Sequence, residues 1–432
     1  MGLLIKGGHL IDPVSGIDGR KDLYIDDDGF VAAVGKSPPA FKVKRTIEAQ
    51  GLVVCPGLVD LRARLREPGL EYKATIESEV HAAVAAGITT LCCPPDTHPV
   101  IDTPAMAQMI QSRAWRFGRA FIHPLGALTR ELEGKLLADM EALDEAGCVG
   151  VTNALAPVTD TLVLRRALEY AASLDLTVFL HAEDPWLRNT GCVHEGEVGT
   201  RLGLPGIPEA AETVGVARDL ALIEQTGCRA HFCNLSSSRA VAMIAEAKQH
   251  GLPVSADVTA HHLHLTEHDI GDFNTQCHVR PPLRSTTDRK GLRRALKNGV
   301  INAICSDHQP HEPDAKLAPF ARSEPGISAL ETLLPLTLKL VNDKLLTLPE
   351  AIALLTHKPA EIIGVDSGQL GAGATADICI FDPEAIWLLT EDKLVSRGHN
   401  TPFLGWEFRG RVTHTLVGGK LVFELANQGR SR

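Results

Sequence analysis

Ionisable and amide side chains recur directly after short apolar stretches of this sequence, where the strands of a sheet are expected to end. These residues are Asp60, Arg62, Arg64, Asp96, Asn153, His181, Glu183, His231, His261, His262, Asp307, His308 and His311. Histidine and carboxylate side chains bind metals and transfer protons, so a site for such chemistry is one interpretation. A single histidine of this kind is more often a structural residue than a ligand. Recurrence at one strand end after another favours a site.

The middle of the chain alternates these apolar stretches with helical patterns. Eight strands are expected, in the segments LVDLRAR, GITTLCCPP, AFIHPLGAL, VGVTNA, TVFLHAE, RAHFCN, PVSADVTAHH and INAICSDH. Helix-like segments between them include ATIESEVHAAVAA, DTPAMAQMIQSRAWR, DTLVLRRALEYAASL and SRAVAMIAEAKQHG. Eight strand–helix units predict an α/β protein with a closed (β/α)8 TIM-type barrel, whose site lies at the carboxyl ends of the strands. The alternative, an open doubly wound sheet, lacks a GxGxxG after its first strand.

Both ends of the chain are different in character. Residues 3–55 and 370–432 contain short strands broken by Gly, Asp and Pro, as in KDLYIDDDGFVAAVG and GRVTHTLVGG. We therefore predict one small β domain formed by both termini. The predicted boundaries are 1–55 and 366–432 for its two parts and 56–365 for the barrel.

Length, composition and charge narrow the classes of protein. The 432 residues suffice for a barrel with an accessory domain. With 44% hydrophobic and 22% charged residues, wholesale disorder is excluded. The net charge of −10 argues against nucleic acid or an anionic membrane surface as a partner.

The expected location is the cytoplasm. The first residues, MGLLIKGGHLIDP, lack the basic and long apolar regions of a secretion signal. No apolar run approaches the roughly 20 residues that span a bilayer. The ten cysteines are scattered without a CxxC pair, which indicates reduced thiols in a soluble protein.

One segment carries a specific resemblance. PGLVDLRARLREPG, residues 56–69, resembles the dihydroorotase motif PG-h-h-D-h-H-x-H-h-R-E-P-G, in which h is hydrophobic. Further similar segments follow in order, namely CPPDTHP, HAED, VTAHHLHLT, RPPLR, SDHQPH, EPGISALETLLPL and EDKLVSRGHNTPF. The resemblance covers essentially the whole chain. It implies an amidohydrolase-type barrel with a flanking β-sandwich.

The resemblance also implies zinc-assisted opening and closing of a cyclic amide, in which an aspartate handles the proton of a metal-bound water. The family pattern has two histidines on the first strand, an anionic bridging residue after the fourth, and histidines after the fifth and sixth. An aspartate after the eighth completes it. His181, His231 and Asp307 match retained positions.

The substrate positions of the family are partly changed. Arg66 matches the arginine that binds the substrate carboxylate, and His311 matches a further substrate position. Asp96 replaces an asparagine, and its charge would repel the anionic substrate. Arg280 replaces another asparagine just before PPLR.

The metal positions depart further from the family. Arg62 and Arg64 replace the two first-strand histidines, and Asn153 replaces the bridging residue. Guanidinium stays protonated and has no lone pair to give. We therefore expect no cofactor and a vestigial Asp307, which pairs with one of the arginines. The alternative is one weakly held zinc ion, on the residual candidates His181, His231 and Asp307.

Three functions remain open from the sequence. The first, implied by the resemblance, is a catalytically inactive dihydroorotase-like protein that serves as the non-catalytic subunit of aspartate transcarbamoylase in pyrimidine biosynthesis, as a homodimer within a larger complex. The second is an active zinc-dependent dihydroorotase or related cyclic amidohydrolase with a reduced metal site. The third is a small-molecule sensor that uses the mouth of the barrel.

Overall fold

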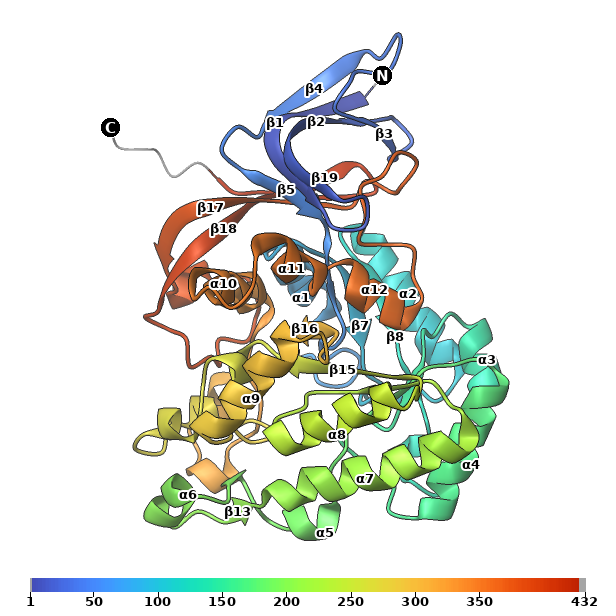
Figure 1. The fold of residues 1–432 in the computed structure, drawn as a ribbon, viewed down its shortest axis with the longest axis vertical. Coiled ribbons are helices and arrows are strands. Elements are labelled where there is room, and N and C mark those ends of the chain that lie inside the picture. The colour runs from blue at the N-terminus through green and yellow to red at the C-terminus, as the bar shows by residue number, and fades with distance from the viewer. Residues whose placement is uncertain (1, 427–432) are drawn as a thin grey trace.

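Eight short parallel strands form a barrel in the middle of the chain, as the sequence predicted (Figure 1). The computed structural model describes residues 2–426. The barrel strands are β6 (Leu58–Asp60), β7 (Ile88–Cys93), β8 (Phe121–Pro124) with its continuation β9 (Gly126–Ala127), β10 (Val151–Thr152), β11 (Val178–Leu180), β14 (Ala230–Phe232), β15 (Val254–Thr259) and β16 (Ala303–Cys305). All pairings between neighbouring barrel strands are parallel.

Two local connections close the ring. Strands β6–β8 form one sheet, and β9, β10, β11, β14, β15 and β16 form another. Leu125 alone separates β8 from β9. The Leu125 amide donates to the carbonyl of Cys93 at 2.9 Å, so the ladder continues across the gap. On the other side, a parallel bridge joins Ala63 to His308. The carboxyl ends of all eight strands therefore surround one mouth.

Helices cover the outside of the barrel (Figure 1). They are α1 (Ile76–Ala85), α2 (Pro104–Phe117), α3 (Met140–Glu145), α4 (Thr161–Ser173), α7 (Glu209–Thr226), α8 (Ser238–Gln249), α9 (Thr286–Lys297), α10 (Leu330–Asn342), α11 (Leu348–Ala353) and α12 (His357–Ile363). The four helices predicted from sequence correspond to α1, α2, α4 and α8. Local signals fix their ends: Thr75 and Ser78 form a capping box at α1, and α2 begins at Pro104 and ends before the left-handed Gly118.

Shorter elements lie in the loops between strands and helices. They are α5 (Pro185–Arg188), β12 (Val193–His194), α6 (Glu197–Leu202), β13 (Gly206–Ile207) and the 3-10 turns Arg130–Leu132, His261–Leu263, Glu267–Ile270, Thr275–Cys277, Pro313–Lys316, Phe320–Arg322 and Glu391–Lys393.

Both ends of the chain build one β domain, as predicted (Figure 1). Its strands are β1 (Gly2–Asp12), β2 (Ile17–Ile25), β3 (Val31–Val34), β4 (Val43–Glu48), β5 (Val53–Pro56), β17 (Ile378–Leu388), β18 (Glu407–Val417) and β19 (Lys420–Glu424). Antiparallel pairing of β5 with β17, with Cys55 opposite Cys379, joins the termini. The strands bend around a core of their own, which includes Ile5, Leu10, Leu23, Ile25, Ile378, Ile380 and Leu416.

The late segment EDKLVSRGHNTPF braces the loop that follows β16. The Asn400 amide donates to the carbonyls of Gln309 and Gly326, and its oxygen accepts from the backbone of His311 at 2.7 Å. Ser396 donates to Glu79, which also lies 2.7 Å from Nε2 of His308. This segment therefore fixes the backbone on which Asp307 sits.

The cysteines have no cross-links: all ten are buried free thiols. Burial raises the pKa of Cys93 and Cys148 to about 12, which keeps these thiols protonated. Over residues 2–426, the helices are too short or too polar to cross a membrane.

Candidate functional site

Both first-strand arginines lie on the same aspartate at the mouth of the barrel. Nε of Arg62 is 3.2 Å and Nη1 of Arg64 is 3.1 Å from Oδ1 of Asp307. The other oxygen of Asp307 accepts from the amide of Gln309 at 3.0 Å. Burial opposes the charge of Arg62, but the surrounding acidic groups, Asp307 foremost, together outweigh burial and raise the pKa of Arg62. The predicted pairing of Asp307 with one arginine thus extends to both.

Asp96, at the end of β7, binds Arg64 as well. Its Oδ2 is 2.7 Å from Nε of Arg64. Burial favours the neutral acid, yet the charge and hydrogen bond of Arg64 lower the pKa of Asp96 below its ordinary value. Arg64 therefore bridges two carboxylates, and the charge of Asp96 is already compensated within the protein.

Asn153 lies where the resemblance places the bridging anion, but its side-chain amide forms hydrogen bonds with two neighbouring loops. Its oxygen accepts from Thr129 at 2.7 Å, and its Nδ2 donates to the carbonyls of Leu132 and Ala156, both at 3.1 Å. The side chain thus ties the loop after β9 to the loop after β10. An amide used in this way cannot bridge metals as an anion.

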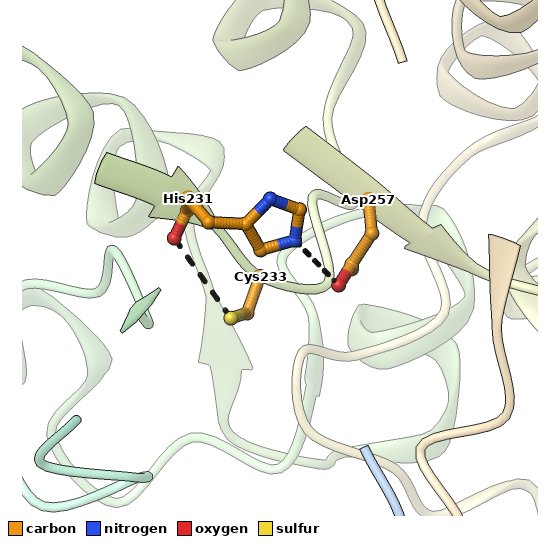
Figure 2. A group of neighbouring side chains, drawn as sticks. All are labelled: His231, Cys233 and Asp257. Carbon is orange, nitrogen blue, oxygen red and sulfur yellow. Dashed lines mark hydrogen bonds and ion pairs between the residues drawn. The ribbon is translucent and has the colours of Figure 1, made fainter. Parts of the chain in front are cut away.

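His231 does not join the group around Asp307, contrary to the expectation of a residual zinc site on His181, His231 and Asp307. It lies within β14, and its Nδ1 is 2.8 Å from the hydroxyl of Ser255. Its Nε2 is 2.9 Å from Asp257, a contact drawn in Figure 2. In the pairing of β11 with β14, His231 lies opposite Phe179. His181 comes two residues after Phe179 and points to the same side, so His231 lies one side-chain repeat deeper in the barrel than His181. It is therefore buried beneath the mouth.

The residue that β14 delivers to the mouth is Asn234, which sequence reasoning missed. Asn234 follows the strand in a left-handed conformation with φ of 56°. Its backbone donates to Asp257 at 2.6 Å, and its side-chain oxygen accepts from Cys305 at 3.3 Å. The signal was present in RAHFCN, where histidine and asparagine are three residues apart.

His181 lies at the mouth, after β11, as predicted. Its side chain is 5% exposed, and its Nε2 is 3.6 Å from Glu183. Both ring nitrogens lack a hydrogen-bond partner among the described residues. Burial lowers the pKa of His181 in spite of Glu183, so the ring is neutral near pH 7.

The side chains of Arg66 and His311 contact each other and the loop after β16. Nε of Arg66 donates to the carbonyl of Pro310 at 3.0 Å, and its Nη2 lies 3.1 Å from Nε2 of His311. Lys73 lies 2.9 Å from Nδ1 of His311. Burial, followed by the charges of Arg66 and Lys73, lowers the pKa of His311 to about 2. The neutral ring accepts from Lys73, so these residues form a structural cluster.

A second ion pair covers the mouth. Arg280 donates from Nε to Glu183 at 2.8 Å and from Nη2 to the carbonyl of Leu155 at 3.0 Å. Burial alone would raise the pKa of Glu183, but His181 and Arg280 lower it to about 2. A hollow of only about 10 Å³ lies beside Arg64, Arg66 and Asp96. That volume holds roughly one water molecule.

This arrangement does not fit the two-metal site of the family. Guanidinium groups stand at the first-strand positions, and the bridging anion is replaced. The one group of donors with ligand-like spacing is His231, Cys233 and Asp257, whose atoms lie within 4.8 Å of one another among the described residues. Asp257 already binds His231 and Asn234, and burial raises the pKa of the Cys233 thiol. The potential ligand atoms of this group are therefore already hydrogen-bonded within the protein or protonated.

Comparisons with known proteins agree with the fold and the motifs. A model of the dihydro-orotase-like family matches residues 51–240, and one of the amidohydrolase family matches residues 325–423. Among solved structures, L-hydantoinase (dihydropyrimidinase) from Arthrobacter aurescens has a TM-score of 0.87 and 24% identity, covering 98% of this chain and 96% of that one. At this identity the likeness shows the fold alone.

Curated relatives span nearly the whole chain. Dihydroorotase-like proteins of Pseudomonas putida and Pseudomonas aeruginosa are 50% and 49% identical, over 97% and 98% of this chain and 98% and 100% of theirs. A dihydroorotase of Syntrophus aciditrophicus is 42% identical over 98% of this chain and 100% of its own. The chain therefore belongs to the dihydroorotase-like family of the amidohydrolase superfamily.

Proposed function

We propose that this protein has lost dihydroorotase activity and serves as a non-catalytic subunit of aspartate transcarbamoylase. The main support for a loss of activity is that Arg62 and Arg64 both form ion pairs with Asp307. Hydrolysis of a cyclic amide needs an activated water and a base to take its proton. Here one oxygen of Asp307 accepts from Arg64 and the other from Gln309, so neither is free to do so.

The substrate side of the site supports the same proposal. Arg66 donates to Pro310, Asp96 is paired with Arg64, and Arg280 is paired with Glu183. These three groups, at the substrate positions of the family, are thus engaged within the protein. The hollow of about 10 Å³ beside Arg64 is far too small for a ring of that kind.

The second candidate is an active cyclic amidohydrolase with a reduced metal site. It is favoured by relatives named dihydroorotase and by the ligand-like spacing of His231, Cys233 and Asp257. The buried, hydrogen-bonded state of these three groups makes it the weaker candidate. A small-molecule sensor is the third.

The proposal of a protein partner rests on the retention of the family's framework. The barrel, its core and the bracing late segment are all present although the metal positions are changed. Most substitutions destabilise, so a fold that served no purpose would be expected to decay. Trp115 and Trp186 are 76% and 82% exposed, and tryptophan is enriched at protein interfaces. A homodimer within a larger, symmetric mixed assembly fits this use.

Co-expression tests the proposal. The transcarbamoylase catalytic chain of the same organism is expressed with and without this protein, and assembly mass and carbamoyl transfer are measured. We expect a larger, more active or more stable assembly when both are present. The mixed assembly should show no dihydroorotate turnover. Transcarbamoylase that assembles and works equally well alone, without co-eluting, contradicts the subunit role, whereas turnover of dihydroorotate contradicts the loss of activity.

A further inference from the structure

Buried nitrogen atoms without hydrogen-bond partners among residues 2–426 recur after the barrel strands. Four of the residues that carry them are Arg62 (Nη2), Arg64 (Nη2), His181 (both ring nitrogens) and Asn234 (Nδ2). The side chains of Arg62, Arg64 and His181 are 5%, 4% and 5% exposed, and Asn234 is 1% exposed. Native proteins satisfy nearly all buried polar groups. These four residues, which we call the mouth cage, therefore require acceptors that the chain does not supply.

The members of the mouth cage lie close together at the carboxyl ends of their strands. Arg62 and Arg64 meet at Oδ1 of Asp307. His181 and Asn234 follow β11 and β14, neighbouring parallel strands in which Leu180 is opposite Phe232. After burial and the opposing effect of Glu183, the charge of Arg62 also acts to lower the pKa of His181, as expected for groups that are close together.

The charges around these donors indicate which kind of ligand they bind. Arg62 and Arg64 are balanced by Asp307 and Asp96, and Arg66 adds a positive charge next to Arg64. The unpartnered guanidinium nitrogens are obligate donors, which a cation cannot satisfy. We propose that the mouth cage binds one small oxyanion, a carboxylate or bicarbonate, at the place where the family holds its metals. This inference rests on the metal-free part of the proposed function.

The shape of the donors points to an oxyanion in particular. Guanidinium groups present their N–H bonds in a planar fork that matches the two oxygens of a carboxylate. His181, neutral and buried, can add a third donor, and Nδ2 of Asn234 a fourth. The four side chains are at most 5% exposed, so a large organic acid cannot reach their nitrogen atoms. The ligand is therefore of formate or bicarbonate size.

The test measures the thermal unfolding midpoint of the full-length protein in sodium formate and in sodium bicarbonate. Sodium gluconate, whose anion is too large to reach side chains that are only 4–5% exposed, keeps the ionic strength constant. Because a ligand bound only by the folded state stabilises it, the midpoint should rise along a saturation curve. Response to formate alone assigns a carboxylate, and response to bicarbonate alone assigns bicarbonate. An unchanged midpoint in both, or an equal rise in sodium chloride, overturns the proposal.

Variants locate the site. Arg62→Met should raise the apparent dissociation constant about tenfold or more, because a charge-assisted donor is lost. Asn234→Asp, which is nearly isosteric, should weaken binding in the same direction by repelling an anion. The matched control is Arg166→Met on α4, a surface arginine that is 61% exposed. Circular dichroism checks that each variant is folded. Wild-type affinity in a folded Arg62→Met or Asn234→Asp protein overturns the assignment.

Zinc analysis of the same samples separates two kinds of failure. Stoichiometric zinc in the wild-type protein contradicts the proposed function and with it the anion site. A zinc-free protein whose unfolding midpoint ignores formate and bicarbonate contradicts the anion site alone.

Discussion

Nη1 of Arg64 lies 3.1 Å from Oδ1 of Asp307, so an ion pair joins the end of the first barrel strand to the end of the last, 243 residues away in sequence. Arg62 binds the same oxygen, and Gln309 holds the other. Both carboxylate oxygens of Asp307 are thus held by internal hydrogen bonds and ion pairs.

The purified protein should contain well below one zinc ion per chain. Three ligand positions carry residues that cannot bind zinc as the family requires, and a catalytic site normally needs three protein ligands in fixed geometry. Elemental analysis after purification without chelators measures this. The Syntrophus aciditrophicus dihydroorotase, purified in parallel, is the control. Zinc that survives dialysis at one ion per chain contradicts the prediction.

Restoring the first-strand histidines should not restore activity. Arg62→His with Arg64→His leaves Asn153 unable to bridge and leaves Asp96 without its arginine partner. We expect no dihydroorotate turnover from this double variant. Adding Asn153→Lys or Asn153→Asp together with Asn234→His supplies the remaining donors and should bring zinc back before it brings activity. Near-normal turnover by the double variant alone would refute this account of the bridge.

Asp307→Asn should strongly destabilise the protein. The change keeps the shape of the side chain but leaves two buried guanidinium groups without their shared anion. Breaking a buried pair in this way costs about 3–5 kcal/mol. Urea unfolding measures the loss in the free energy of unfolding. Asp175→Asn, which breaks the exposed pair with Arg229, is the control and should cost less than about 1 kcal/mol. Equal effects of the two variants would contradict a stabilising role for Asp307.

Glu331 should make the protein less stable as the pH rises. Burial raises its pKa from the ordinary 4.5 to about 7, although Val395 and Ser396 donate hydrogen bonds to it. The stabilising contribution of the proton is complete below pH 4.5 and is lost as pH rises through 7. Between pH 5 and 8 the wild type should lose up to about 3 kcal/mol more than Glu331→Gln. Denaturant unfolding across this range, with the exposed Glu145→Gln as control, tests the difference; parallel curves for wild type and Glu331→Gln would refute it.

The architecture could be predicted from the sequence alone. Alternation of strands and helices is a local property, because side-chain periodicity and caps act within a few residues, so the barrel strands and helices such as α1 and α8 could be predicted. That Arg62, Arg64 and Asn153 cannot serve the family's metal site likewise follows from residue type alone. The β domain was foreseen as two similar ends, although the pairing of Cys55 with Cys379 needed the structure.

Which of the strand-end residues contact one another could be learned only from the three-dimensional structure. Asp307 binds both arginines, and Asp96 binds Arg64, through contacts between residues far apart in sequence. The segment RAHFCN contains both His231 and Asn234, and only the fold shows that Asn234 is the one at the mouth of the barrel. The physical reason is that β14 is three residues long and ends in a left-handed turn at Asn234, so the depth of each side chain depends on strand register and not on residue type.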